Sequence, residues 1–206
     1  NYLIRGSKDL QERFIGNAFM LNEAERERIL KHPTGKYPHT ALTKPFYDKA
    51  KDLDDVTKMQ YIDIHFWLIG DILLKADKMS MANSLEVRVP FLDRVVFDVA
   101  RKVPTEYKVN KENTKFAMRQ AAHRYLPDMV AEKKKLGFPV PIRIWLREEN
   151  YYNMVKEAFH SPAAEEFFKV DEIMKYLDEH KAGKADNSRK IWTIYMFLVW
   201  HKQFFG

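Results

Sequence analysis

The sequence predicts a mainly α-helical protein, and three kinds of observation support this fold class. Apolar residues in 56–73 recur at intervals of three and four, which is the period of an amphipathic helix. The segment 189–205 is apolar on nearly every side, as is typical of a buried or partner-facing helix. Residues that favour helix starts and stops, such as Asn22, Pro104 and Ser161, bound the other helical segments.

The N-terminal region is expected to hold two short helices and a loop. The helices are predicted over 8–19 and 23–31, with Asn22 as the N-cap of the second. The segment 32–45 contains three prolines and a glycine, and we therefore predict that it is largely a loop.

A long helix is predicted to begin at Asp54 or Asp55, because acidic residues suit the positive N-terminal end of a helix. Its apolar stripe is wide, so we expect this helix to be central, nearly enclosed and ended by a break at 78–80. His65 is interpreted as a core or boundary histidine, because no second ligand stands at metal-ligand spacing.

Helices are also expected in the second half of the chain. Asp93 is expected to cap a helix whose valines face inward, and Asn113 or Thr114 is expected to cap the next. On that second helix, Lys115 and Arg119 stand four residues apart and form a basic edge to which we assign no chemistry. Further helices are predicted over 142–146, 151–159 and 189–205. Ser161-Pro162 is expected to open another helix, and Val170-Asp171 one that runs to Ala182-Gly183.

Composition bounds the class of protein. Hydrophobic residues make up 46% of the 206 residues, which argues against disorder. The chain has no cysteine, which excludes disulfides and favours a reducing compartment. Because the sequence shows no signal peptide, we expect a cytoplasmic protein.

The net charge of +6 admits ATP, nucleic acid or membrane headgroups as partners. However, its basic and acidic residues are interspersed, which favours an ordinary solvated surface over a nucleic-acid stripe. The apolar run of the predicted helix 189–205 is about half as long as a membrane span requires, so we expect this helix to be buried or partner-facing rather than membrane-spanning.

The most informative stretch is 73–93, which reads LLKADKMSMANSLEVRVPFLD. In an extended segment successive side chains point to opposite faces, so Glu86 and Arg88 share one face and apolar residues share the other. On residue types alone, this pattern is typical of helix caps followed by a structural salt bridge.

A second informative stretch, 130–141, contains three adjacent lysines that run directly into Leu-Gly-Phe-Pro. Adjacent lysines usually mark a solvated turn. Here Gly137 permits a backbone turn closed to other residues, and prolines stiffen the chain around Phe138. One of the lysines could therefore be held against a cleft.

The order of these residues resembles a known family. Asp-Lys-Met-Ser-Met-Ala followed by Leu-Glu-Val-Arg-Val-Pro-Phe-Leu-Asp closely resembles the signature in the synthetase half of glutamine-hydrolysing asparagine synthetases. The related β-lactam synthetases carry a diverged version. The second stretch is similar to the family pattern Arg-x-Lys-x-Gly-Phe-x-x-Pro, and the family's lysine falls on Lys135. Lys133 stands where the family usually has arginine, so a bidentate contact there becomes a point charge.

The resemblance implies a single helical fragment over 1–206, with a motif core at 73–141 and a helical packing region at 142–206. It would be the C-terminal, helical portion of an adenine-nucleotide α-hydrolase-like (ATP pyrophosphatase) synthetase domain. The family's Ser-Gly-Gly-x-Asp-Ser loop, its Ser-Gly-Glu-Gly-Ser-Asp-Glu segment and its cysteine nucleophile do not occur in these 206 residues. The nucleotide-binding sheet and the glutaminase domain are therefore expected elsewhere in a parent chain.

The family reaction implied by the resemblance converts aspartate to asparagine. ATP adenylates the side-chain carboxylate to β-aspartyl-AMP, and ammonia released from glutamine then attacks it. By resemblance, Lys135 is the catalytic cation and Glu86 is a carboxylate that orients the site. The supporting or substrate-site residues are Asp77, Arg88, Lys133, Gly137 and Phe138.

The resemblance also implies ATP and Mg²⁺ in the intact enzyme. We assign no metal ligand in this chain and expect the fragment to hold neither tightly and to be inactive alone. Its expected partners are the glutaminase domain, the ATP pyrophosphatase sheet, aspartate, ATP and ammonia, with a homodimer left open. The alternatives are a β-lactam-synthetase-like or other amidoligase fragment, and a basic helical module that binds nucleic acid or protein.

Overall fold

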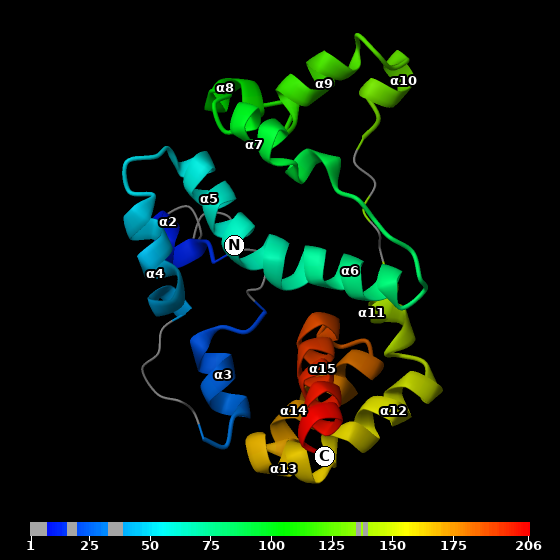
Figure 1. Ribbon diagram of the computed structural model, residues 1–206. Coiled ribbons are helices and arrows are strands. Elements are labelled where there is room, and N and C mark those ends of the chain that lie inside the picture. Colours follow the sequence, from blue (N-terminus) through cyan, green and yellow to red (C-terminus); the bar gives the residue numbers. More distant parts are fainter. Residues whose placement is uncertain (1–7, 16–19, 33–38, 135–136, 138–139) are drawn as a thin grey trace. The chain divides into compact units, whose positions relative to one another are not determined.

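The computed structural model describes residues 8–15, 20–32, 39–134, 137 and 140–206. Helices dominate these residues (Figure 1), which confirms the predicted mainly helical class. The α-helices are α2 (Leu10–Arg13), α3 (Glu23–Ile29), α4 (His39–Lys49), α5 (Asp55–Asp63), α6 (Leu74–Met81), α7 (Arg94–Ala100), α8 (Thr105–Lys108), α9 (Phe116–Ala122), α10 (Asp128–Ala131), α11 (Ile142–Trp145), α12 (Glu149–Phe159), α13 (Pro162–Phe167), α14 (Val170–Lys181) and α15 (Ser188–Phe205). A π-helix, η1, covers Ile64–Leu73, and a 3₁₀-helix, η2, covers Pro90–Leu92.

The contacts divide the chain into two compact units. Unit 1 consists of Asn1–Ala18 and Pro38–Gly137, and unit 2 consists of Phe19–Tyr37 and Phe138–Gly206. The second unit therefore joins two segments that are far apart in the sequence.

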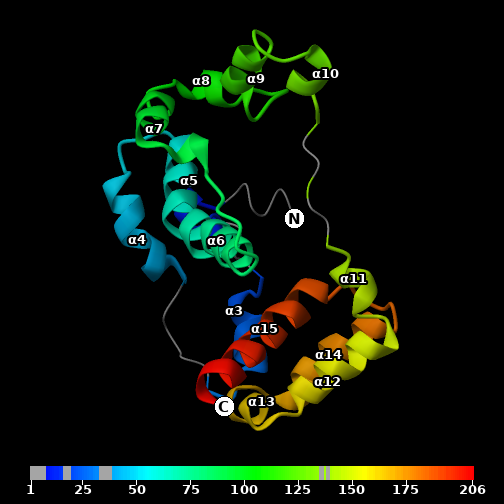
Figure 2. The same ribbon diagram turned by 45° about the vertical axis from the view of Figure 1, so that its right-hand side comes forward.

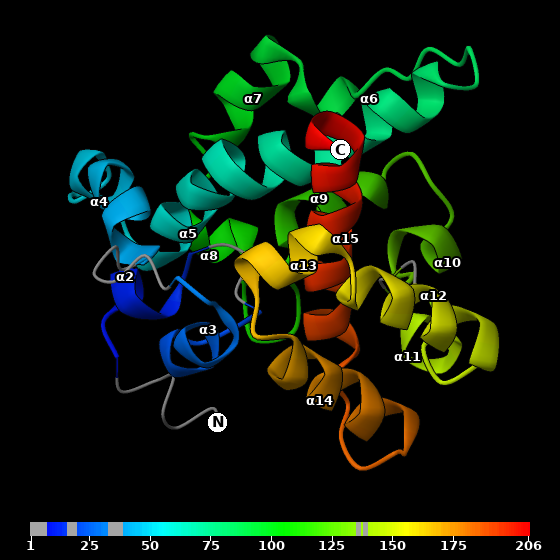
Figure 3. The ribbon, with the colours of Figure 1, turned by 90° about the horizontal axis from the view of Figure 1, so that it is seen from below.

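Unit 2 is a helical bundle with its own apolar core. Helices α12, α14 and α15 pack against one another, and α13 contacts both α12 and α15 (Figures 2 and 3). The buried core residues are Ile29, Leu146, Val155, Phe159, Ala164, Phe168, Ile173, Tyr176, Leu177, Ile191, Ile194 and Leu198. The last helix buries one face, whereas Trp200 on its other side is 48% exposed. No helix in the described part of the chain has the length and apolar character needed to cross a bilayer.

The short helix α3 joins this bundle through backbone and side-chain contacts. Its predicted N-cap is confirmed, because Asn22 and Glu25 form a capping box. The Lys31 amide donates to the Phe167 carbonyl oxygen at 3.0 Å, and the Arg28 guanidinium donates to the Tyr176 hydroxyl at 2.6 Å. These bonds tie residues near position 30 to the C-terminal third of the chain.

In unit 1 the helix α4 replaces part of the predicted loop. The prediction for 32–45 is wrong from residue 39 onward, and 33–38 lies outside the described residues. Pro45 sits inside α4, where it has no amide for the helical hydrogen bond, at a cost of about 3 kcal/mol. Packing compensates, because Thr43 and Tyr47 of the same helix are buried and α4 contacts both α2 and α5.

The end of one helix and the cap of another also differ from the predictions. The helix predicted over 8–19 is shorter, because Phe14 after α2 adopts an extended backbone. The helix α9 has Lys115 at its N-cap without a side-chain cap, so neither Asn113 nor Thr114 caps it. Instead, the Asn110 side chain accepts from the Asn113 amide at 2.7 Å in the preceding turn.

The predicted long helix is confirmed, and it continues from α5 through η1 into α6. It ends at Met81, so the break predicted at 78–80 is wrong. It is not nearly enclosed either: in the described structure Ile62 is buried, but Ile69 is 58% exposed. A π-helix bonds each residue to the fifth along rather than the fourth. An apolar stripe drawn with the α-helical period therefore does not mark one face of η1.

The contacts of His65 support its interpretation as a boundary histidine. The ring is half-buried, its Nδ1 lies 2.8 Å from the Tyr61 carbonyl oxygen, and its centroid is 4.9 Å from that of Phe46. Across the described residues, no three His, Cys, Asp or Glu side chains gather as metal ligands.

Asp54 caps the long helix, and this contact predicts a pH dependence. Its carboxylate accepts from the Thr57 hydroxyl at 2.7 Å and from the Val56 and Thr57 amides. The Thr57 hydroxyl bond, with the amide bonds, lowers the pKa of Asp54 from 3.8 to about 2. The cap therefore contributes fully above pH 3.8, and its contribution is lost as pH falls toward about 2.

We expect a carboxyl-carbon NMR titration of Asp54 to show a midpoint near 2, and the variant Thr57→Val to move it toward 3.8. Thr57→Ser, which keeps the hydroxyl, is the matched control and should leave the midpoint low. A midpoint at 3.8 in the unsubstituted chain would contradict this assignment.

Candidate active site

The signature stretch begins at the junction of η1 and α6 and leaves the helix through a tight turn at Ser84. Ser84 has a φ of 56°, in the left-handed region. Its amide donates to the Met81 carbonyl oxygen at 3.0 Å, and the Leu85 amide donates to the Ser80 carbonyl oxygen at 2.9 Å. This pair of bonds forms a Schellman-type helix end, at a backbone cost of about 1–2 kcal/mol for a non-glycine residue. The turn therefore has a defined geometry.

The acidic and basic residues of the signature form the predicted ion pair. Glu86 and Arg88 contact each other through their side chains, which are 69% and 85% exposed. An exposed pair of this kind adds only about 0–1 kcal/mol to stability. The three apolar residues of 85–89 are also exposed, each by at least 46%. Both charges therefore lie at a surface where a ligand or another polypeptide can reach them.

Asp77 lies on α6, one turn before the helix ends, and is exposed. Its carbonyl oxygen accepts a hydrogen bond from the Ser80 hydroxyl at 3.1 Å. The Asn83 side-chain amide donates to the Met79 carbonyl oxygen at 2.9 Å. The side-chain bonds at this helix end thus come from Ser80 and Asn83.

The signature ends at Asp93, which caps α7 as predicted. Its carboxylate accepts from the Val95 amide at 2.9 Å and the Val96 amide at 3.3 Å. The prediction that the valines of this helix face inward is wrong for the described structure, because Val95 is 72% and Val99 64% exposed. Capping depends on neighbours within three residues, whereas burial depends on what packs against the helix.

The stretch 130–141 is called the basic segment below. Arg119, a residue for which the sequence predicted no role, hydrogen-bonds to the backbone at its start. Its Nη1 donates to the Ala131 carbonyl oxygen at 2.7 Å, and its Nη2 donates to the Lys133 carbonyl oxygen at 2.9 Å. Both acceptors are backbone groups, which every residue carries, so no side-chain pattern indicates this contact. The side chains of Lys133 and Lys134 are exposed.

Lys135 and Phe138, which the sequence places at the candidate site, lie outside the described residues. Gly137 is described and exposed, and a Cβ there would meet no heavy atom within 4 Å. Crowding therefore does not require a glycine at this position. The common pocket of Lys135 and Glu86 stays a prediction.

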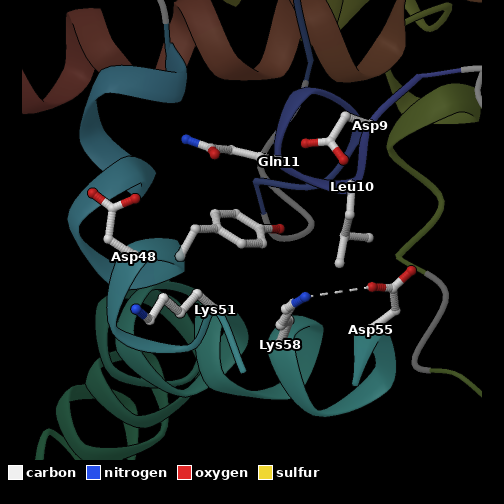
Figure 4. A pocket seen from close by; sticks show the side chains of 8 residues that line it. Asp9, Leu10, Gln11, Asp48, Lys51, Asp55 and Lys58 are labelled. Carbon is white, nitrogen blue, oxygen red and sulfur yellow. Dashed lines mark ion pairs between the residues drawn. The ribbon is translucent and has the colours of Figure 1, made fainter. Parts of the chain in front are cut away.

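A hollow of about 210 Å³ lies elsewhere in unit 1 (Figure 4), bounded by α2, α4 and α5. Lys58 faces Asp55 across 3.8 Å, and the Tyr47 hydroxyl donates to the Phe14 carbonyl oxygen at 2.8 Å. Burial raises the pKa of Tyr47 from 10.0 to about 12, so this hydroxyl stays a donor well into the alkaline range. The lining residues are Asp9, Leu10, Gln11, Tyr47, Asp48, Lys51, Asp55 and Lys58. Its charges are of both signs and it includes none of the predicted site residues, so we assign it no ligand.

Comparison with known proteins gives consistent matches. The asparagine synthase family matches residues 5–202. The glutamine-hydrolysing asparagine synthetase 1 of Bacillus subtilis is 48% identical over 97% of this chain, and a putative glutamine-hydrolysing asparagine synthetase of Mycobacterium bovis is 43% identical over 98%. Asparagine synthetase B of Escherichia coli is 32% identical over 43% of the chain and 16% of its own length.

The chain spans 31% of the length of the Bacillus and Mycobacterium relatives. No solved structure gives a significant match. The family match nevertheless covers nearly all of the chain, including the signature at 73–93 and the basic segment. This chain belongs to the asparagine synthase family.

Proposed function

We propose that this chain is part of an ATP-dependent enzyme that converts aspartate to asparagine with ammonia from glutamine. The observation that carries the proposal is the 48% identity, over 97% of the chain, to a glutamine-hydrolysing asparagine synthetase. The reaction passes through β-aspartyl-AMP and releases pyrophosphate and then AMP. Because the chain corresponds to 31% of that relative, the rest of the machinery belongs to further polypeptide.

We propose that this further polypeptide supplies an ATP pyrophosphatase sheet and a glutaminase domain. Together with the sheet, the helices of this chain would complete an adenine-nucleotide α-hydrolase-like synthetase domain. The exposed charges of 85–89 support this proposal, because a site shared with another segment requires accessible side chains.

Within this site, Lys135 would place a cation at the α-phosphate and at the acyl carbon. Negative charge develops on both groups in the transition states, and a fixed cation in a water-excluded site stabilises it. Glu86 would orient the site, and Arg88 would neutralise Glu86 through the observed ion pair. Lys133 would place a second positive charge near the phosphates. This charge would be more mobile than that of an arginine, because a lysine does not form a planar bidentate contact.

The structure identifies no magnesium ligand among the described residues. Mg²⁺ bound with a nucleotide is usually held by one or two carboxylates together with the phosphates, and in the described part of the chain no group of three His, Cys, Asp or Glu side chains could hold a metal ion alone. We therefore assign no magnesium ligand here and derive no step through the metal.

A chimera tests the proposed function. This chain would replace the matching 199 residues of the Bacillus subtilis relative. We expect the chimera to form asparagine only when aspartate, ATP and glutamine are all supplied, with ammonium able to replace glutamine. Glutamate in place of aspartate is the control substrate. A chimera that hydrolyses glutamine but forms no asparagine would refute the proposal.

The chain by itself should not adenylate aspartate. It lacks the family's Ser-Gly-Gly-x-Asp-Ser nucleotide loop, so the α-phosphate of ATP has no complete binding site. We expect no aspartate-dependent exchange of labelled pyrophosphate into ATP with the 206-residue chain, under conditions in which the chimera shows it. Exchange by the chain alone at a rate similar to that of the chimera would contradict this expectation.

A further inference from the structure

The guanidinium of Arg119 links α9 to the first residues of the basic segment. Its two terminal nitrogens donate to two different carbonyl oxygens, those of Ala131 and Lys133, at 2.7 and 2.9 Å. Its Nε is shielded from solvent and has no hydrogen-bond partner among the described residues. The two Nη contacts are therefore the polar bonds that orient this side chain.

Arginine suits this place because its planar fork presents two donors in a fixed geometry. The accepting carbonyls lie at the end of α10 and just beyond it, where the last groups of a helix lack intrahelical partners. Ala131 is buried, so one of the two bonds is partly removed from water, where hydrogen bonds from a charged donor are stronger. A lysine at 119 would keep the positive charge but would lack the planar fork that bonds to both carbonyls.

A second contact also joins α9 to α10. The Nδ1 of His123 lies 2.9 Å from the Asp128 carboxylate, at the opposite end of α10 from the Arg119 contacts. The short helix α10 is therefore tied to α9 at both of its ends. These contacts at both ends of α10 therefore fix the direction of the backbone at Lys133.

We propose that Arg119 is a positioning residue for synthesis, which sets the backbone from which the basic segment departs. This inference rests on the proposed function, because Lys135 follows Lys133 by only two residues in the sequence. Arg119 itself would touch neither substrate nor ATP. Its effect would pass through the Lys133 carbonyl to the lysine that meets the developing negative charge.

The first experiment measures the basic segment without any activity assay. In the 206-residue chain, Arg119→Gln removes the charge and one donor fork, and Arg119→Lys keeps the charge. We expect trypsin to cleave after Lys133 about tenfold or more faster in Arg119→Gln, because hydrogen bonds from charged donors are lost. Arg119→Lys should give an intermediate rate. The matched control is Arg101→Gln, which removes an exposed guanidinium paired with Asp98 on α7.

Equal cleavage rates in Arg119→Gln and Arg101→Gln would overturn the inference. Loss of the helical circular-dichroism signal in both Arg119 variants would also overturn it, because Arg119 would then support the whole unit rather than one segment. Hydrogen exchange of the amides that follow Ala131 gives an independent check on the same variants.

The second experiment separates this inference from the proposed function. In the chimera, Arg119→Lys should lower kcat for asparagine formation about tenfold, leave KM for ATP within about twofold, and spare glutamine hydrolysis. Suppose that Lys135→Ala inactivates the chimera but Arg119→Lys keeps the kcat of the unsubstituted chimera. This result would overturn the positioning role of Arg119 and leave the proposed function standing. No synthesis by the unsubstituted chimera would refute the proposed function, while the cleavage rates still decide whether Arg119 holds the segment.

Discussion

Replacement of Lys135 by alanine should reduce asparagine formation by the chimera about 100-fold or more, while glutamine hydrolysis continues. A cation that meets charge developing in a transition state typically contributes this much to the rate when it acts in a site shielded from water. Because the loss falls on the transition state, we expect kcat to drop far more than KM for ATP changes.

The matched control is Lys134→Ala, which removes the same charge from the adjacent residue. Lys134 is exposed and does not coincide with the family's lysine position. We expect this variant to retain synthesis within a few fold. Equal losses in Lys135→Ala and Lys134→Ala would show that the segment acts through its total charge, and the assignment of Lys135 would fail.

Replacement of Phe159 by alanine should lower the free energy of unfolding of unit 2 by about 3–5 kcal/mol. Phe159 has no exposed surface and lies at the C-terminal end of α12, in the core shared with α14 and α15. Its removal loses the transfer free energy of a phenyl ring and leaves a cavity that rigid helices fill poorly. A change of this size is a large fraction of the stability of a domain.

Urea unfolding followed by tryptophan fluorescence measures this change, because Trp145, Trp192 and Trp200 all lie in unit 2. Trp67 of unit 1 would be replaced by phenylalanine in every variant to remove its signal. The matched control is Phe205→Ala, since Phe205 is 67% exposed and should change stability by no more than about 0.5 kcal/mol. Similar losses from the two substitutions would contradict the assigned core.

Local contacts were the part of the structure that could be predicted. The caps at Asn22, Asp93 and Ser161 bond to amides two or three residues away, so a short window of sequence contains both partners. The Glu86–Arg88 pair is likewise local, because alternation along an extended segment puts both side chains on one face. The family motifs are linear patterns and were visible for the same reason.

Other features depend on partners distant in sequence or on the backbone itself. Pro45 favours a loop locally, and only the packing of α4 on α2 and α5 makes a helix there. The apolar residues of 56–73 recur at the α-helical interval, so periodicity predicted an α-helix where the structure has the π-helical η1.

The sequence by itself determined the mainly helical class, the capped helix starts, the ion pair of the signature and the family to which the chain belongs. Only the tertiary structure decided the division into two units, the helix through Pro45 and the hold of Arg119 on the Lys133 backbone. The physical reason is the nature of the partners. A cap joins a side chain to an amide two or three residues away, and the salt bridge joins Glu86 to Arg88, so both partners lie in a short window of sequence. Arg119 bonds to carbonyl oxygens 12 and 14 residues away, and because every residue carries a carbonyl, only folding selects which of them lie within reach.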